Sequence, residues 1–296
     1  MQSLHFKNNA DFSDGDNEML ASAEIAPSKK PCPQAVTRKI KSSISDRHVS
    51  PVLRALPAAR LQMGTLTGVK AKIYNQLWRS IAEGRVKPGT KLQERLIREQ
   101  MDVSRMLVIS VFQQMAAEGI VVFPMNKSPY VARPSPREAQ DVLTALDLNM
   151  AHVIWELSAQ SRQIPEEQRD WIDRHLRMMT DDLPTAHLLE SELLILLAVV
   201  CGNVLLTEQV TRAVVLRTLS LKLYSEFPPK SWSFASWRSL VDAIFAHQPE
   251  VALREYEARS LELRRSMRFG MSYQEYQDIA RSFETVPRGF GRLGGA

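Results

Sequence analysis

The sequence predicts a mainly α protein that carries a small two-stranded wing. Two observations support this fold class. Between residues 69 and 134, three short helical segments separated by turns precede two short runs rich in β-branched and aromatic residues. From residue 135 onward, helical periodicity continues without any alternating strand pattern. We therefore expect an N-terminal helical module with a wing, followed by a C-terminal all-α helical bundle.

The first helix of the module begins near Val69, because Ile73, Leu77 and Ile81 recur every fourth residue. Gly84 is suited to the position just after the end of this helix. A turn follows, and a second, short helix is expected over residues 94–100.

The third helix of the module is expected to begin after Ser104, which stands where an N-cap residue belongs. This helix runs to Gly119. Residues 120–123 and 130–132 then predict two short strands joined by a turn.

The remaining chain predicts six successive helices. Their expected ranges are residues 136–160, 165–180, 184–201, 203–225, 232–247 and 248–269. We therefore expect a helical domain over residues 135–270 and a C-terminal tail over residues 271–296. The tryptophans are expected to pack inside this bundle, whereas Arg212 and Arg217 are expected to be exposed or, less simply, to hold an anionic ligand.

Residues 1–68 show no sustained apolar periodicity and contain several prolines and a serine-rich stretch. Few groups in this segment can offset the entropy cost of ordering the chain, so we expect a mostly disordered tail. Its basic run at residues 29–41 fits a solvated linker better than a phosphate-binding strip.

The composition excludes several classes of protein. The 296 residues are 44% hydrophobic and 24% charged, which is typical of a globular protein and not of a disordered one. The most apolar stretch, residues 193–206, is shorter than the about 20 residues of a membrane span. Two cysteines cannot build a disulfide framework, so we expect a cytoplasmic protein with no membrane partner.

The charge is distributed unevenly along the chain, whose net charge is +5. Residues 25–134 contain nineteen basic and six acidic residues, which gives +13, whereas residues 1–24 and residues 135–296 each carry −4. This concentration favours a polyanionic partner for the N-terminal half.

The predicted module contains four stretches with a recognisable order and spacing, namely residues 73–77, residues 84–95, the run from Val103 to Arg105, and residues 116–121. In this order and spacing the module resembles the GntR family of bacterial transcription regulators. The resemblance implies a winged helix-turn-helix DNA-binding domain at residues 69–134. The helical remainder resembles the FadR-type subfamily, and residues 200–206 are similar to its characteristic helix break.

The resemblance implies that the third helix contacts base edges in the major groove of DNA. Arg105 can donate two parallel hydrogen bonds to a guanine edge or a charged bond to a phosphate, and Ser104 and Met106 lie beside it. Arg95, on the preceding helix, is expected to reach a base or the DNA backbone.

The wing is implied to contribute Asn126 and Lys127, whose basic side chain can enter the minor groove. The sequence departs from the family at two places in this surface. Ile109 stands where members usually carry a second arginine, and Ser128 replaces the usual glycine of the wing. Ile109 can touch a thymine methyl group, but its presence indicates reduced or altered base reading.

The resemblance also bears on a metal site, because many FadR-type members hold a divalent metal with one acid and three histidines. The corresponding positions are Glu190, Leu194, Trp237 and Ser260. No imidazole remains, so we expect no metal and no cofactor. These four residues either line a cavity for an apolar or neutral ligand, or Leu194 and Trp237 fill it; both interpretations stay open.

The sequence contains no glycine-rich phosphate loop, nucleophile elbow or Cys–His pairing, so we do not expect an enzyme. The main hypothesis is a cytoplasmic, nucleoid-associated homodimer that binds a double-stranded DNA operator under the control of a small-molecule effector. The alternative is a non-enzymatic interaction protein with weakened DNA reading that acts by heterodimerisation. The replaced arginine position and the lost metal ligands motivate this alternative.

Overall fold

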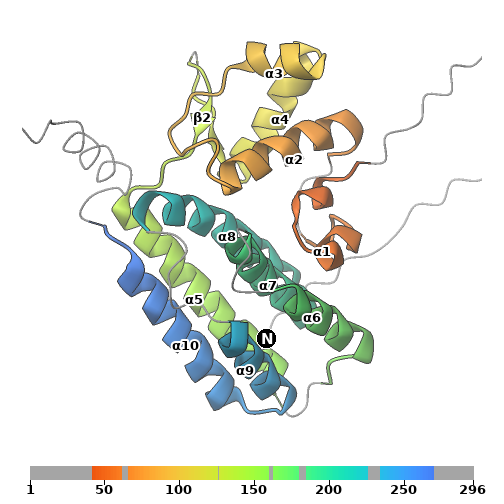
Figure 1. Cartoon of the computed structure of the whole chain (residues 1–296), viewed down its shortest axis with the longest axis vertical. Helices are drawn as coiled ribbons and strands as arrows, with labels where there is room; N and C mark the ends of the chain where they lie inside the picture. The colour runs from red at the N-terminus through yellow and green to blue at the C-terminus, as the bar shows by residue number, and fades with distance from the viewer. Residues whose placement is uncertain are drawn as a thin grey trace, which may run out of the picture. The chain divides into compact units, whose positions relative to one another are not determined.

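The computed structural model describes residues 42–61, 66–125, 127–159, 163–179, 185–225 and 234–269. Over these residues the protein is mainly helical and contains a two-stranded antiparallel sheet (Figure 1). The predicted fold class, a winged helical module followed by an all-α bundle, is confirmed.

The winged module consists of three helices and a hairpin. Its elements are α2 (Gly68–Ala82), α3 (Glu94–Met101), α4 (Arg105–Ala117), β1 (Val121–Val122) and β2 (Tyr130–Val131). The two strands pair with Val121 opposite Val131 and Val122 opposite Tyr130. Apolar side chains from α2 and α4 are buried in the core, including Ile73, Tyr74, Ile81, Val108, Phe112 and Met115.

Local backbone chemistry fixes where α3 ends and α4 begins. Asp102, which follows α3, has a φ of 49° in the left-handed region, so the chain turns sharply there. Ser104 then caps α4, because its hydroxyl oxygen accepts a hydrogen bond from the backbone N–H of Leu107 at 3.4 Å. The predicted cap is therefore confirmed, and it sets the orientation of the first turn of α4.

The helical bundle follows the module. Its helices are α5 (Pro136–Ser158), α6 (Glu166–Met178), α7 (Ala186–Cys201), α8 (Val204–Tyr224), α9 (Phe234–Phe245) and α10 (Pro249–Ser266). Helix α7 is buried almost along its whole length and packs against α5, α6 and α8. Helix α10 lies beside α5 and α9 (Figure 1). Among the residues that the structure describes, no helix is long and apolar enough to cross a bilayer.

Two side chains of the bundle contradict the sequence expectations. Trp155 is 48% exposed on α5, although the tryptophans were expected to pack inside. Arg217 is only 2% exposed on α8, although an exposed position was favoured. Its guanidinium pairs with Glu190 on α7, and this partner allows the charge to be buried. Arg212, one and a half turns earlier, is exposed as expected.

The expectation of a disordered tail is wrong for residues 42–61, which we call the N-terminal strap. The strap contains the short helices η1 (Ile44–Arg47) and α1 (Pro51–Ala55). Three side chains of the strap, those of Ile44, Leu53 and Leu61, are fully buried. The strap is ordered because apolar surface from other elements covers it, although its own sequence has no helical period.

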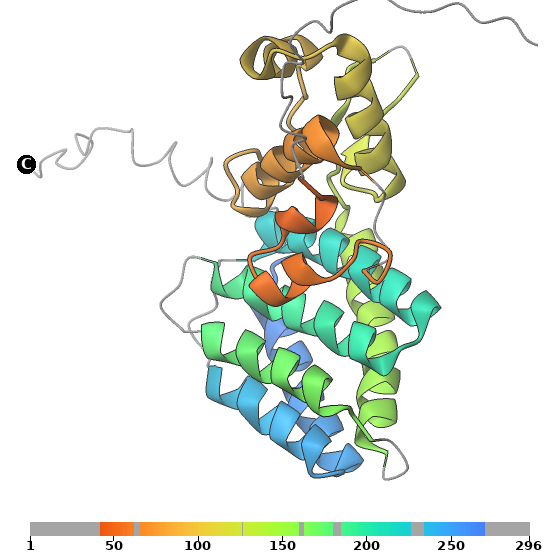
Figure 2. The same cartoon turned by 90° about the vertical axis from the view of Figure 1, so that its right-hand side faces the viewer.

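The strap contacts both the winged module and the bundle, and Figure 2 shows it beside both. Helix η1 packs on α2, where the side chain of Asn75 donates a hydrogen bond to the carbonyl of Ser43 at 2.8 Å. Helix α1 packs on α6, and Thr211 of α8 donates a hydrogen bond to the carbonyl of Leu61 at 3.3 Å. The strap therefore connects the two parts of the fold.

Candidate nucleic-acid interface

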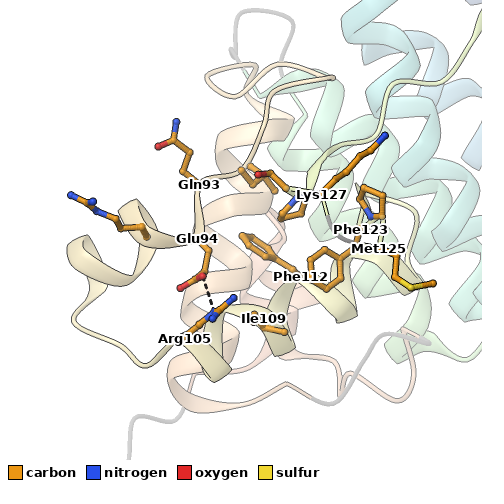
Figure 3. A pocket seen from close by; sticks show the side chains of 13 residues that line it. Gln93, Glu94, Arg105, Ile109, Phe112, Phe123, Met125 and Lys127 are labelled. Atoms are coloured by element: carbon orange, nitrogen blue, oxygen red, sulfur yellow. Dashed lines mark ion pairs between the residues drawn. The ribbon is translucent and has the colours of Figure 1, made fainter.

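An open groove of about 820 Å³ lies between α3, the first turns of α4 and the wing (Figure 3). Four of the seven predicted DNA-contacting residues line it, namely Arg95, Arg105, Ile109 and Lys127. The other lining residues are Leu92, Gln93, Glu94, Phe112, Phe123, Pro124, Met125, Ser128 and Pro129. The structure thus places the predicted charges on α3, α4 and the wing around one concave surface.

Arg105, the first residue of α4, forms an ion pair with Glu94, the first residue of α3. The Arg105 Nε atom lies 3.1 Å from Glu94 Oε2, and Figure 3 shows the two side chains facing each other. The side chain of Arg105 is 69% exposed, whereas that of Glu94 is 24% exposed. The guanidinium is therefore oriented by α3, and most of its surface remains available to a partner.

Arg95 is held differently, by an ion pair within α3. Its Nε atom lies 2.8 Å from Glu99 Oε1, one helical turn away, and the side chain of Arg95 is 79% exposed. An exposed pair of this kind contributes little to stability, on the order of 0.3–0.5 kcal/mol. Arg95 can therefore exchange Glu99 for a phosphate or a base at small cost.

The remaining predicted residues take different positions. Ser104 is the N-cap of α4 and is exposed. Met106 is 73% exposed in the first turn of α4, and Lys127 is exposed on the wing. Asn126 lies outside the described residues.

Several residues of the groove were missed by the sequence reasoning. Glu94 supplies a carboxylate, while Phe112, Phe123 and Met125 supply an apolar lining (Figure 3). Met125 is 90% exposed. The sequence shows Glu94 as an acidic residue at the start of the predicted helix α3. Its ion pair with Arg105 of α4 could not be predicted, because it depends on the two helix starts lying close together in the fold.

The four residues at the positions that correspond to the family's metal site, where no metal was expected, make contacts within the protein or are buried. Glu190 Oε1 lies 2.6 Å from Arg217 Nη2, and both side chains are buried. Leu194 and Trp237 are 2% and 3% exposed. The Ser260 hydroxyl donates a hydrogen bond to Asp147 Oδ2 at 2.7 Å.

This donor set does not fit a divalent metal. Two of the four side chains, Leu194 and Trp237, offer only carbon or an N–H group to a cation. The single carboxylate, Glu190, already faces the guanidinium of Arg217, which also donates a hydrogen bond to Ser191 Oγ at 2.9 Å. An arginine thus supplies the positive charge that compensates Glu190.

The sequence of the winged module matches a known protein family. Residues 69–131 match the family described as "Bacterial regulatory proteins, gntR family". No curated protein matches the chain. Among solved structures, a GntR transcriptional regulator from Rhodococcus sp. RHA1 is 16% identical with a TM-score of 0.56, covering 67% of this chain and 99% of its own.

A second solved structure, E. coli McbR/YncC, is 12% identical with a TM-score of 0.54 and covers 74% of this chain and 99% of its own. At such identities the likeness concerns the fold. Both matches extend well beyond the winged module, so the bundle is part of the shared architecture. Residues 69–131 therefore match the GntR-family model, and the described residues have the fold of GntR-family transcription regulators.

Proposed function

We propose that this protein is a dimeric, DNA-binding transcription regulator of the FadR type within the GntR family. The observation that carries the proposal is the placement of Arg95, Arg105 and Lys127 around one groove at the start of α4. A double-stranded DNA operator is the partner, and the protein acts at the nucleoid in the cytoplasm without enzymatic activity.

The geometry of α4 supports DNA as the partner. The first turn of a recognition helix points its side chains at base edges in the major groove. Helix α4 presents Arg105 and Met106 there, and its N-terminal end carries a partial positive charge that favours phosphates. Lys127 lies on the wing, which in this arrangement follows the adjacent minor groove.

Exposed apolar side chains on α5 and α8 support dimerisation through a second copy of this chain. Leu148 and Trp155 on α5 are 70% and 48% exposed, and Val204 and Leu205 on α8 are 58% and 69% exposed. Leu148 and Trp155, seven residues apart, share one side of α5, and large exposed apolar side chains that share a side are typical of a protein interface.

A groove of about 390 Å³ between α5 and α8 is lined by Leu205 and by Glu208 and Arg212, whose side chains lie one turn apart on α8. In a two-fold pairing each copy presents both charges, so the glutamate of one copy can meet the arginine of the other. This self-complementarity favours a homodimer, whose symmetry would match a palindromic operator.

The proposal includes a small-molecule effector that binds the bundle without a metal. The buried pair of Glu190 and Arg217, together with the buried side chains of Leu194 and Trp237, favours a bundle interior filled by protein. An effector that reaches Glu190 and Arg217 therefore has to separate α7 from α8, whereas one that reaches Ser260 has to displace its hydrogen bond to Asp147 of α5. Such a movement is how binding would be transmitted to the rest of the fold.

The test is a selection from random double-stranded DNA with the full-length protein, followed by binding measurements on the enriched duplex. Arg105→Ala is expected to reduce affinity for that duplex by about tenfold to a hundredfold, as loss of a base or phosphate contact does. Arg254→Ala, which removes an exposed arginine on α10, serves as the matched control. Enrichment of no sequence, or equal binding by both variants, would contradict the proposal.

The second candidate function is an interaction protein on the same fold that acts by heterodimerisation. It is favoured by the acidic and apolar part of the groove, where Glu94, Phe123 and Met125 stand among the basic residues. The Arg105→Ala variant separates the two functions. If that variant leaves both DNA retention and target-gene expression unchanged, the interaction protein is the better description.

A further inference from the structure

The winged module exposes several large apolar side chains. They are Leu96 on α3, Met106 on α4, Val122 on β1, and Phe123 and Met125 on the wing. Single exposed apolar residues are common, but Phe123 and Met125 line the groove together with Ile109, and such a group indicates a contact with another molecule.

Two apolar residues lie in the first turns of α4, and one of them, Ile109, lines the groove. Met106 is 73% exposed, and Ile109, half-buried, follows it three residues later on the same side of the helix. Figure 3 shows Ile109 beside the ion pair of Arg105 and Glu94. The first turns of α4 therefore present one guanidinium and two carbon-only side chains to a partner.

The charges at the rim of the groove identify the occupant as nucleic acid rather than an apolar protein segment. Arg95, Arg105 and Lys127 surround the apolar residues, and residues 70–134 carry a net charge of +6 from eleven basic and five acidic residues. In the major groove the thymine 5-methyl is the apolar group that an aliphatic or thioether side chain can contact. Met106 and Ile109 cannot donate hydrogen bonds to guanine.

We propose that Met106 and Ile109 read the 5-methyl groups of thymines, which makes the protein selective for thymine at two positions of each operator half-site. This inference rests on the proposed function, since it specifies which bases the same surface reads. Arg105, oriented by Glu94, then reads a neighbouring guanine or holds a phosphate, and Lys127 positions the wing. Thymine is distinguished from the other bases by burial of its methyl group and not by an additional arginine contact.

Replacement of thymidine by deoxyuridine tests the inference, because it removes only the methyl group. The full-length protein is used to select a duplex of roughly 30 base pairs, which spans two half-sites and their flanks. The duplex is then synthesised with deoxyuridine at one thymidine at a time. At each contacted position the affinity of the wild-type protein is expected to fall about fourfold, the value for one lost apolar carbon group.

The side-chain assignment is tested with Met106→Ala and Ile109→Ala on the same duplexes. Each variant is expected to lose its sensitivity to deoxyuridine at one position and to keep it at the other. Leu261→Ala, which shortens a 48% exposed leucine on α10, should respond to deoxyuridine as the wild type does.

The outcomes of this experiment distinguish three statements: that methyl groups are read, that Met106 and Ile109 read them, and that the protein binds an operator. If no deoxyuridine position weakens binding to an enriched duplex, methyl reading is wrong while the proposed function stands. If deoxyuridine weakens binding equally in the wild type and both α4 variants, Met106 and Ile109 are not the reading residues. If no duplex is enriched at all, the proposed function fails, and this inference fails with it.

Discussion

The carboxylate of Glu192 accepts a hydrogen bond from the backbone N–H of Ser50 at 2.8 Å, although 142 residues separate the two in the chain. The same carboxylate accepts the backbone N–H of Val49 at 2.7 Å and faces the His48 Nδ1 atom at 3.3 Å. Glu192 is buried on α7. A single carboxylate thus fixes the N-terminal strap to the helical bundle.

We predict that Glu192→Gln lowers the free energy of unfolding by roughly 2 kcal/mol, the value of hydrogen bonds to a charged acceptor. The amide has only one oxygen to accept hydrogen bonds, so one of the two strap N–H groups would face an NH₂ group. Urea unfolding of the full chain measures the change. Glu257→Gln, at an exposed position on α10, is the matched control and should change stability by less than about 0.5 kcal/mol.

Stability should also decrease on acidification because of the buried groups around Glu192. Burial lowers the pKa of His48 and of His175 below the ordinary value of 6.5. Burial alone would raise the pKa of Glu192, but the bonds from His48, Ser50 and Val49 outweigh it and hold that pKa below 4.5. The unfolded chain therefore binds more protons at acidic pH than the folded chain does.

The contribution of the two histidines is complete above about pH 6.5 and is lost as the pH falls below this value. The contribution of Glu192 is lost in turn as the pH falls below 4.5. Thermal unfolding at pH 7.5, 6.5 and 5.5 is expected to show a progressive decrease in midpoint. A midpoint that rises on acidification over this range would contradict the assignment.

His175 allows this pH dependence to be assigned. Its Nε2 atom lies 2.8 Å from the Leu189 carbonyl, which only accepts, so Nε2 carries the proton. In the neutral ring, which burial favours by lowering the pKa of His175, the Nδ1 atom accepts a hydrogen bond from the Ser50 hydroxyl at 2.9 Å. His175→Gln should therefore reduce the decrease between pH 7.5 and 5.5, whereas His152→Gln, at an exposed position on α5, should leave it unchanged.

A buried ion pair attaches the strap to the winged module. Arg47 Nη1 lies 2.9 Å from Glu118 Oε2, and the Tyr74 hydroxyl donates a hydrogen bond to the same oxygen at 2.5 Å. The guanidinium also stacks over the Trp78 ring, with a distance of 5.2 Å to the ring centroid. The side chain of Arg47 is 1% exposed, so solvent cannot replace its partner.

Glu118→Gln is expected to cost about 3 kcal/mol of stability, because it leaves the buried guanidinium without its compensating charge. The double variant Arg47→Met, Glu118→Gln should cost less than Glu118→Gln alone, because no unpaired charge then remains buried. Urea unfolding of both single variants and the double variant gives the coupling energy. Additive single effects would show that the pair is not coupled.

Much of the fold follows from local sequence signals. The helix over Gly68–Ala82 is visible as a four-residue apolar repeat, and the start of α4 is visible as Ser104 before an apolar run. These signals depend on residues within one or two turns of each other. For the same reason the groove residues Arg95, Arg105 and Lys127 could be placed on neighbouring elements before the structure was known.

The features that sequence reasoning missed depend on contacts between distant residues. The strap is ordered by its hydrogen bonds to Glu192 and by the burial of Ile44 and Leu53. No apolar periodicity in the sequence of the strap predicts these contacts. Arg217 is buried because Glu190, 27 residues earlier, lies on the facing helix. A residue's own neighbours in the sequence carry no information about which helix face will oppose it.

Gly119, which follows α4, should resist substitution for two separate reasons. Its φ of +77° is unfavourable for any residue with a Cβ, and an added Cβ would lie 3.2 Å from Leu216 Cδ2 on α8. Gly119→Ala is expected to cost about 1–3 kcal/mol in urea unfolding. Gly89→Ala is a matched control, because Gly89 has a φ of +86° but its Cβ would meet only Arg133 Cδ at 3.6 Å. The difference between the two variants measures the contact of the winged module with α8.

The pair of Glu190 and Arg217 gives a last prediction, which concerns metals. Arg217→Met leaves the buried Glu190 carboxylate without its partner and should cost about 3–5 kcal/mol, whereas Glu190→Gln combined with Arg217→Met should recover part of this loss. Zn²⁺ added to the wild-type protein should leave the thermal midpoint unchanged, because Leu194 and Trp237 provide no ligand. A rise in midpoint that grows with Zn²⁺ concentration, and that Glu190→Gln abolishes, would show that the metal displaces Arg217 and binds this carboxylate.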